Sequence, residues 1–252
     1  MLLFSNAIVL NKISYSDTSL IFRVFTEDYG KITILAKGVL RPKNIIGPLI
    51  EPANHLYIHY YSKSNRDIQI LKDASFVDQY PDIRKNLSKI ILSLAIVEII
   101  DKATLASNPY PILYKLCWRT LEKLNDGKQN IWLIFVFYLY QLSIRLGFMP
   151  DLDKCNKCFS KLFNANIESY SGEILCKKCI TSCQISLQDS SFKLLKQITG
   201  LHLDDLLNIN FPKNDIFNII LFLDLFSSIH IEGLNRVKSM KMVRNLINEG
   251  KN

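Results

Sequence analysis

The sequence predicts an α+β protein in which a small β-barrel precedes a helical body that carries a four-cysteine insert. Residues up to about position 75 alternate apolar and polar side chains with a period of two, which is typical of short strands. From Pro81 onward, apolar side chains recur at helical spacing. Five of the six cysteines lie in one short segment. These shifts predict domains at 1–78 and 79–252, with the cysteine insert at 153–184.

Composition and charge narrow the class of protein. The chain has 252 residues and is 48% hydrophobic, which is enough apolar surface for a sizeable core. Its net charge of +8 favours nucleic acid or an acidic partner, without bearing on the fold. The first residues do not form the apolar run of a signal peptide, and the run from Ile131 to Tyr140 is too short to span a bilayer. We therefore expect a cytoplasmic protein with reduced cysteines and no membrane partner.

Five strands account for the N-terminal region. They are expected at residues 7–13, 19–26, 31–37, 54–61 and 66–72. A tight turn at Asp28-Tyr29-Gly30 joins the second strand to the third. Five short strands connected in this way predict a closed barrel, and the OB-fold is the common five-stranded case.

The third strand and the loop after it carry unshielded positive charge. Ile32, Ile34 and Ala36 alternate with polar residues, and Leu35 is the apolar exception on the polar face. No acidic residue lies between Asp28 and Glu51. The predicted phosphate-binding residues are Arg23, Lys31, Lys37, Arg41 and Lys43. The alternative is an ordinary solvated strand face in a basic protein.

The fourth strand has an aromatic face. Leu56, Ile58 and Tyr60 point one way, whereas alternating histidines and tyrosines from position 55 to 61 point the other way. Such a face beside a basic strand suits the stacking of unpaired bases, worth roughly 1–3 kcal/mol for each base. We predict this role for Tyr57 and His59. The alternative is that these rings pack against the following helices.

Helices are expected in the rest of the chain. The first is expected at 87–100, and the second begins at Asn108-Pro109 and ends near 125–127. The third covers 129–146, with stop signals at Gly147 and Pro150. The fourth begins with a capping box at Ser186 to Asp189 and ends at Gly200, and the fifth covers 215–231. The final segment forms a second basic stripe with Arg236, Lys238, Lys241 and Arg244. That stripe fits phosphate, an acidic peptide or plain solvent.

The cysteine segment has the spacing of a metal site. Cys155 with Cys158, and Cys176 with Cys179, form two C-x2-C pairs separated by 17 residues. This pattern is typical of one structural zinc ion held by four thiolates. A closed shell of four ligands leaves no open position for catalysis. Cys183 is a spare thiol, and the alternative for the whole segment is chance clustering of reduced cysteines.

Motifs for enzymatic chemistry are missing from the sequence. It contains no G-x-x-x-x-G-K-[ST] phosphate loop, no G-x-G-x-x-G motif and no H-E-x-x-H motif. The four histidines have no catalytic spacing, and no nucleophile elbow is present. We therefore predict a binding protein and not an enzyme.

A set of short segments runs in order along the chain: residues 7–10, 15–20, 25–31, 36–38 and 41–43, the segment around Pro52, the strand to Leu71, residues 146–150, both cysteine pairs and residues 238–239. Through these segments the whole chain resembles the RecO family of bacterial DNA repair and recombination mediators. Asp17 stands where the family usually has Glu, and Phe159 follows the second cysteine where Gly is common.

The resemblance implies an N-terminal OB-fold, a helical domain and a zinc-ribbon-like insert. It also implies a DNA repair and homologous recombination mediator that binds single- and double-stranded DNA and anneals complementary strands without ATP. With RecR, such a protein helps to load RecA onto DNA coated by single-stranded-DNA-binding protein (SSB), in the cytoplasm and near the nucleoid.

Three other functions fit parts of the sequence. The main alternative is an adaptor whose helical domain binds the acidic tail of SSB, with DNA contact secondary. A metal-dependent nuclease or deaminase is disfavoured because four thiolates would close the metal site. A zinc-ribbon transcription factor is disfavoured because no helix-turn-helix pattern flanks the cysteines.

Overall fold

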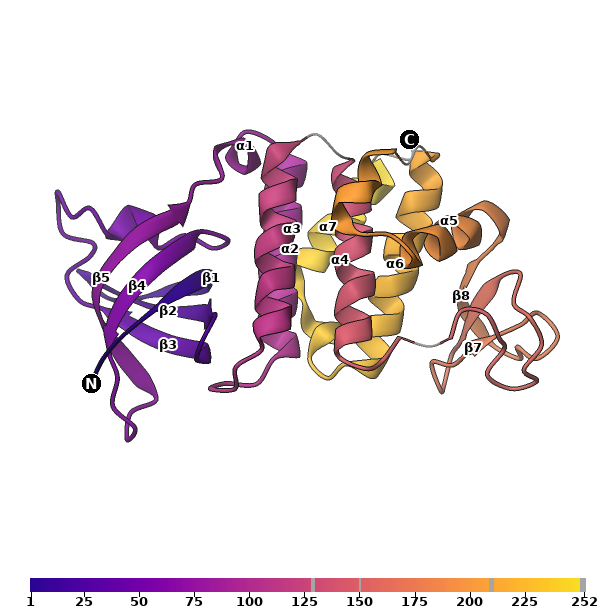
Figure 1. The fold of residues 1–252 in the computed structure, drawn as a ribbon, viewed down its shortest axis with the longest axis horizontal. Helices are drawn as coiled ribbons and strands as arrows, with labels where there is room; N and C mark the ends of the chain where they lie inside the picture. The colour runs from indigo at the N-terminus through magenta and orange to yellow at the C-terminus, as the bar shows by residue number, and fades with distance from the viewer. Residues whose placement is uncertain (128–129, 150, 209–210, 250–252) are drawn as a thin grey trace. The chain divides into compact units, whose positions relative to one another are not determined.

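A computed structural model describes residues 1–127, 130–149, 151–208 and 211–249. The chain forms two compact units, Met1–Asn125 and Asp126–Asn252. The first unit contains a β-barrel and three helices, and the second contains helices and a small sheet (Figure 1).

The barrel confirms the predicted fold class. Its strands are β1 (Leu2–Ser16), β2 (Ser19–Thr26), β3 (Gly30–Ala36), β4 (His55–Tyr61) and β5 (Ile68–Asp78). They close in the order β1-β2-β3-β5-β4, with β3 and β5 parallel and the other pairs antiparallel. The prediction of β1 was too short because this strand pairs with β4 through Leu2–Ile8 and with β2 through Ala7–Ser16. A bulge after Val9 breaks the alternation on which the prediction relied.

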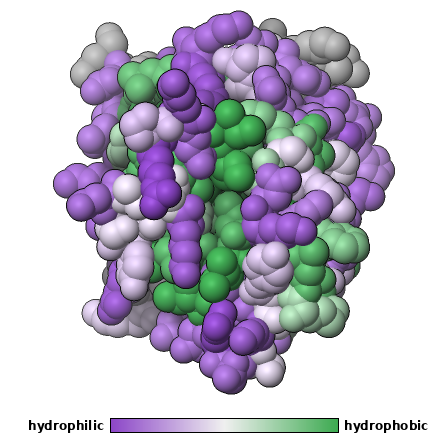
Figure 2. Space-filling model, turned by 90° about the vertical axis from the view of Figure 1, so that its left-hand side faces the viewer, coloured by the Kyte–Doolittle hydropathy of each residue, from purple (hydrophilic) through white to green (hydrophobic). Residues whose placement is uncertain are grey.

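The interior of the barrel is apolar, as the alternation predicted. Leu56, Ile58 and Tyr60 of β4 are at most 2% exposed and pack with Phe22 and Ile34. Leu35, the apolar exception on the other face of β3, lies in register with Ile21 of β2 and Ile70 of β5, and all three are half-buried. Figure 2 shows, on the side of the structure where the barrel lies, apolar side chains gathered in a hollow between hydrophilic ones.

Three helices complete the first unit: α1 (Pro81–Arg84), α2 (Leu87–Ala103) and α3 (Pro111–Asp126). The Asn86 side chain caps α2 by accepting a hydrogen bond from the backbone N–H of Lys89. Helix α3 begins at Pro111, two residues after the predicted Pro109. Because a residue before proline avoids the helical region, Tyr110 cannot belong to the helix, and Pro111 takes its first position.

The second unit combines helices with a three-stranded sheet. The helices are α4 (Ile131–Arg145), α5 (Asp189–Thr199), α6 (Lys213–His230) and α7 (Lys238–Glu249), with short 3-10 turns at Gly47–Leu49 in the first unit and Leu203–Asn208 and Leu234–Arg236 in the second. The sheet has the order β7 (Ile174–Leu175), β6 (Ala165–Glu168), β8 (Cys183–Leu187).

The predicted ends of these helices hold in part. Gly147 follows Leu146, the C-cap residue of α4, and has a φ of +80°, as its predicted role in ending the helix requires. Gln129 and Pro150, which the sequence also placed at the ends of this helix, lie outside the described residues. The predicted capping box is wrong: Ser186 belongs to β8 and donates a hydrogen bond to Asn166, and α5 begins at Asp189 without a side-chain cap. Within the described ranges, no helix has the length and apolarity needed to cross a membrane.

Candidate nucleic-acid interface and metal centre

Three of the predicted cations lie on one loop after β3, called here the basic loop (residues 37–43). Lys37, Arg41 and Lys43 are exposed, and none of them forms an ion pair with any residue in the described part of the chain. The loop is fixed by its backbone, since the N–H of Leu40 donates to the carbonyl of Thr18 at 2.9 Å. Gly38 has a φ of +69°, which is the left-handed turn that glycine favours. The basic loop therefore presents three available positive charges to solvent.

The other two predicted cations have a different environment, and this corrects the picture of one exposed cationic face. Lys31 is only 8% exposed, and its Nζ donates to the backbone carbonyls of Asp101 and Thr104 at 2.5 and 2.7 Å. The Asp101 carboxylate lies 3.4 Å from Lys31 Nζ and 3.1 Å from an Arg23 nitrogen. Burial lowers the pKa of Lys31, and the attraction of Asp101 opposes that shift.

This arrangement follows from where α2 lies. Asp101 sits near the end of α2, is 6% exposed and also accepts a hydrogen bond from Asn11 of β1 at 3.2 Å. One carboxylate thus joins three barrel strands to the helix. Lys31 is a structural residue, and Arg23 is half-buried and shares its charge with Asp101. Of the five predicted cations, the three on the basic loop are therefore the ones fully open to phosphate.

The predicted aromatic face of β4 divides into an exposed part and a buried part. Tyr57 is 37% exposed and contacts His59 edge-on, with 5.1 Å between ring centroids. Phe4 of β1 joins them at 6.4 and 5.9 Å, because it lies in register with His59. Phe4 was not among the predicted site residues, because it lies in the continuous apolar run Met1–Phe4, which has no period-two pattern. Asp73 of β5 lies opposite His59 and adds a negative charge beside these rings.

His55 follows the packing alternative. It is 3% exposed, its Nδ1 lies 2.8 Å from the Asp78 carboxylate and its Nε2 lies 2.7 Å from the Tyr114 hydroxyl of α3. Trp118 of α3 donates to the same carboxylate at 3.1 Å. Burial lowers the pKa of His55, and Asp78 acts in the opposite direction. This network fixes α3 to the barrel, and the buried His55 ring cannot stack on a DNA base.

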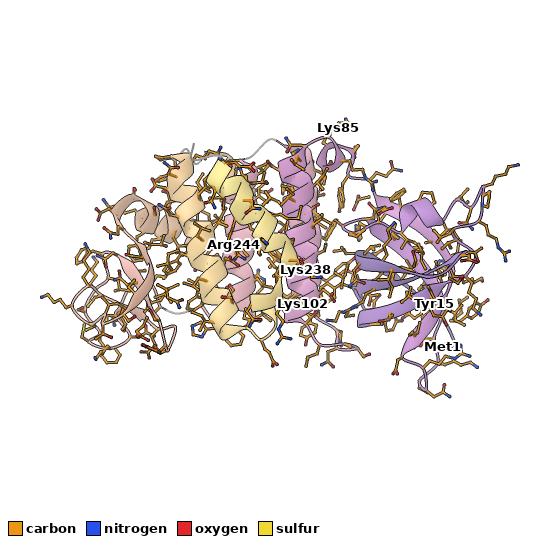
Figure 3. The ribbon with its side chains drawn as sticks, turned by 180° about the vertical axis from the view of Figure 1, so that it is seen from behind. Met1, Tyr15, Lys85, Lys102, Lys238 and Arg244 are labelled. Carbon is orange, nitrogen blue, oxygen red and sulfur yellow. The ribbon has the colours of Figure 1, made fainter. Side chains whose placement is uncertain are left out.

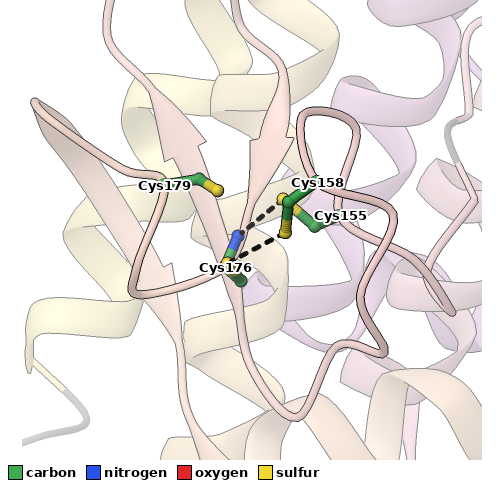
Figure 4. A group of neighbouring side chains, drawn as sticks. All are labelled: Cys155, Cys158, Cys176 and Cys179. Atoms are coloured by element: carbon green, nitrogen blue, oxygen red, sulfur yellow. Dashed lines mark hydrogen bonds between the residues drawn. The ribbon is translucent and has the colours of Figure 1, made fainter.

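The two C-x2-C pairs come together in the second unit. The Sγ atoms of Cys155, Cys158, Cys176 and Cys179 all lie within 4.8 Å of one another (Figure 4). Zinc–sulfur bonds of about 2.3 Å in a tetrahedron place sulfurs about 3.8 Å apart, and Cys158 and Cys176 are separated by 3.8 Å. The backbone N–H of Cys176 also donates to Cys155 Sγ at 3.3 Å. The four cysteines are therefore placed to hold one metal ion.

The four thiols and their neighbours shift one another's ionisation in opposite directions. A hydrogen bond from Ser160 lowers the pKa of Cys158 to about 6. The neighbouring Cys158 raises the pKa of Cys179 to about 12. Four thiolates this close repel one another, so a bound cation is needed for all four to be ionised together. Cys183 is exposed, and its Sγ lies 3.2 Å from the Ile185 carbonyl.

Phe159 explains why glycine suits the position after the second cysteine. It has a φ of +58°, and its side chain is 73% exposed. A non-glycine residue in the left-handed region costs about 1–2 kcal/mol, which a change to glycine would relieve. Glycine loses more conformational entropy on folding, and this offsets about 0.5–1 kcal/mol of that gain.

We expect Phe159→Gly to strengthen retention of a metal ion by the four cysteines by up to about fivefold, because a gain of about 1 kcal/mol has that effect. A chelator competition would measure the change. Phe163→Gly is the matched control, since Phe163 is 72% exposed and has no positive φ. Equal effects of the two substitutions would show that backbone strain at Phe159 is irrelevant.

Three residues of the second basic stripe, Lys238, Lys241 and Arg244, lie on α7, and Lys238 and Arg244 are labelled in Figure 3. The fourth, Arg236, ends the 3-10 turn before this helix. Arg244 forms an ion pair with Asp224 of α6, and burial raises the pKa of that carboxyl group while Arg244 opposes the rise. The opposite side of α7 buries Met240, Val243 and Ile247. This pattern is that of an amphipathic helix with a solvated polar face.

An OB-like barrel with an exposed basic loop, followed by helices and a four-cysteine cluster, defines a multidomain protein built around an OB-type module. Family models agree with this class. The model described as Recombination protein O N terminal matches residues 1–80, and Recombination protein O C terminal matches residues 84–241. Together they cover most of the chain, and the chain belongs to the RecO family of DNA repair proteins.

Individual relatives support this assignment. The chain is 25% identical to a protein of Prosthecochloris aestuarii over 96% of its own length and 97% of the relative. It is 32% identical to a protein of Salinibacter ruber, over 60% of this chain and 58% of the relative. A third protein, from Chlorobium limicola, is 30% identical over 62% and 59% of the two chains. Each of these relatives is named DNA repair protein RecO.

Proposed function

We propose that this protein binds single- and double-stranded DNA without reading its sequence and anneals complementary strands without ATP. The observation that carries the proposal is the basic loop, where Lys37, Arg41 and Lys43 are exposed and have no ion-pair partner among the described residues. Phosphate contacts of this kind give affinity and no base preference. The aromatic cluster of Phe4, Tyr57 and His59 offers ring faces to unpaired bases nearby in the same barrel.

Annealing follows from charge neutralisation. Two DNA strands repel each other through their phosphates, and cationic side chains that bind both strands reduce that repulsion. Base pairing then supplies the free energy, so the protein needs neither a nucleotide site nor a catalytic group. Membership of the RecO family supports further steps in the proposal: with RecR, the protein helps to load RecA onto SSB-coated DNA in the cytoplasm, near the nucleoid.

We also propose that the metal is one structural zinc ion held by the four clustered cysteines. Four thiolates close the tetrahedral shell, and the bound ion supplies a cross-link and no reactive water. The ion would join the 155–158 turn to the 176–179 turn and so stabilise the short sheet of β6, β7 and β8 between them.

A strand-annealing assay without nucleotide tests the proposed activity. We expect the protein to accelerate pairing of complementary strands, bare or coated with the cognate SSB, with the same rate in the presence and absence of ATP. Alanine at Lys37, Arg41 and Lys43 together should remove most of the acceleration.

The control for this assay replaces three other exposed lysines, Lys85, Lys115 and Lys193, and so removes the same net charge. If both triple variants anneal equally well, the basic loop has no special role. If the wild-type protein gives no acceleration, the annealing proposal itself fails.

A further inference from the structure

The first unit contains a cavity of about 380 Å³ at the end of the barrel where β1 and β3 begin and β4 ends. Its lining includes Leu3, the turn residues Asp28 and Tyr29, Tyr60 of β4, and Lys63 and Arg66 of the β4–β5 loop. Small-ligand pockets measure about 300–1,000 Å³, so this cavity has room for one small ligand. None of these residues takes part in the basic loop or the aromatic cluster.

Tyr60 gives the cavity a polar group that lacks a partner. Its side chain is 2% exposed and its hydroxyl makes no hydrogen bond with any described residue. Among the described residues, the Tyr80 hydroxyl is the one that lacks a hydrogen-bond partner and is also completely shielded from solvent. The Tyr60 hydroxyl lacks a partner too but is not completely shielded, so it is accessible from the cavity. Burial raises the pKa of Tyr60, and neighbouring Tyr29 and Asp28 add to the rise. The hydroxyl therefore stays protonated and can donate a hydrogen bond to a ligand.

The walls of the cavity suit a flat, partly polar ring. The Tyr29 ring is 37% exposed and meets the Tyr60 ring edge-on at 6.3 Å between centroids. Leu3 and Ile32 supply apolar surface beside them. The Asp28 carboxylate accepts a hydrogen bond from Ser5 through one oxygen, Oδ2, at 2.6 Å. Its other oxygen has no partner among the described residues and can accept from an amine.

Two cations stand at the rim on a loop with fixed geometry. Lys63 and Arg66 are exposed and form no ion pair within the described chain. Gln69 holds their loop by accepting from the Lys63 backbone N–H and donating to the carbonyls of Lys63 and Arg66. The N-terminal ammonium of Met1 donates to the Ser62 carbonyl at 2.9 Å. A phosphate can therefore bind at the rim without ordering the loop first.

We propose that this cavity binds one nucleotide of a DNA strand whose base carries an exocyclic amine. The base would lie against Tyr29, its ring atoms would bond the Tyr60 hydroxyl, its amine would donate to Asp28, and its phosphate would bind Lys63 and Arg66. The inference rests on the proposed DNA-binding function, whose phosphate contacts are independent of sequence, and adds to it one position that favours bases with an exocyclic amine over thymine. Thymine has no exocyclic amine and is excluded from the full set of contacts.

Fluorescence of 2-aminopurine, which has such an amine, tests the site. One probe is a thymine 12-mer with a single central 2-aminopurine, and the second is the free 2-aminopurine deoxynucleoside monophosphate. The wild-type protein should change the emission of the 12-mer and bind it more tightly than an all-thymine 12-mer. Tyr60→Phe should weaken binding of the 2-aminopurine strand about 2- to 10-fold, the loss expected for one hydrogen bond, and leave the all-thymine strand unchanged.

Matched variants separate this site from general effects. Tyr80→Phe removes a hydroxyl that is sealed outside this cavity, and Lys72→Ala removes an exposed barrel lysine outside its lining. Neither should act on the 2-aminopurine strand selectively, whereas Lys63→Ala with Arg66→Ala should weaken its binding.

The outcomes distinguish the two proposals. If the wild-type protein binds neither 12-mer, the proposed DNA-binding function fails. If it binds both equally and Tyr60→Phe changes nothing, DNA binding stands and the nucleotide site is refuted. Binding of the free monophosphate with no emission change from the 12-mer would also overturn the site as a DNA contact.

Discussion

Replacing Asp101 with alanine is expected to destabilise the first unit by about 3–5 kcal/mol. The substitution leaves the Lys31 ammonium buried without its carboxylate, and removal of one partner from a buried ion pair has a cost of this size. It also frees Arg23 and Asn11 from α2. Urea or guanidinium unfolding, followed by a signal from the barrel unit, measures the loss.

A second variant shows whether the charge is the cause. Lys31→Met combined with Asp101→Leu removes both buried charges and should recover much of the lost stability, because apolar pairs often replace buried ion pairs without cost. Glu51→Ala is the exposed control. Glu51 pairs with Lys12, their side chains are 41% and 31% exposed, and such a pair contributes at most about 1 kcal/mol to stability. A loss for Asp101→Ala no larger than that of Glu51→Ala would contradict the role given to this carboxylate.

Replacing Cys155 with alanine is expected to abolish zinc binding and unfold the segment around it. Cys155 is fully buried, and its sulfur also accepts the Cys176 N–H, so the loss removes a ligand and an internal contact. Zinc contributes about 10–16 kcal/mol to the folding of small zinc-finger peptides, which cannot order themselves without it. Metal quantification and hydrogen exchange over residues 151–187 measure both effects.

The control is Cys183→Ala, because Cys183 lies outside the four-cysteine cluster. That variant should keep one zinc ion for each chain and normal protection of the segment. DNA binding by the barrel unit should persist in both variants. A Cys155→Ala protein that still holds one equivalent of zinc would mean that the metal has other ligands.

Much of the fold could be read from local patterns. The alternation in β2, β3 and β4 placed these strands within about one residue, since each has one face in a single barrel core. The four cysteines of the metal cluster were identified by spacing alone, because C-x2-C pairs bring sulfurs to one point whatever the intervening fold. The end of α4 near Gly147 could be predicted because glycine adopts a positive φ at a helix end whatever the surrounding fold.

The predictions were wrong where a contact with a residue far away in the sequence determines the structure. Lys31 lies on the face of β3 that should carry cations, but α2 brings Asp101, 70 positions away, against that face. No local pattern contains that contact. The spacing of Ser186 to Asp189 fits a capping box, but pairing with β6 places Ser186 in strand β8. The proposed nucleotide cavity could not be predicted for the same reason, because its lining comes from four separate segments of the unit.

The most direct test of the central claim is the salt dependence of single-stranded DNA affinity. Each phosphate contact to a single strand adds about 0.7 to the slope of log affinity against log salt concentration. Alanine at Lys37, Arg41 and Lys43 should therefore flatten the wild-type slope by about 2, while alanine at Lys85, Lys115 and Lys193 should leave it unchanged. A slope that stays the same in the basic-loop variant would contradict the assignment of this surface to DNA.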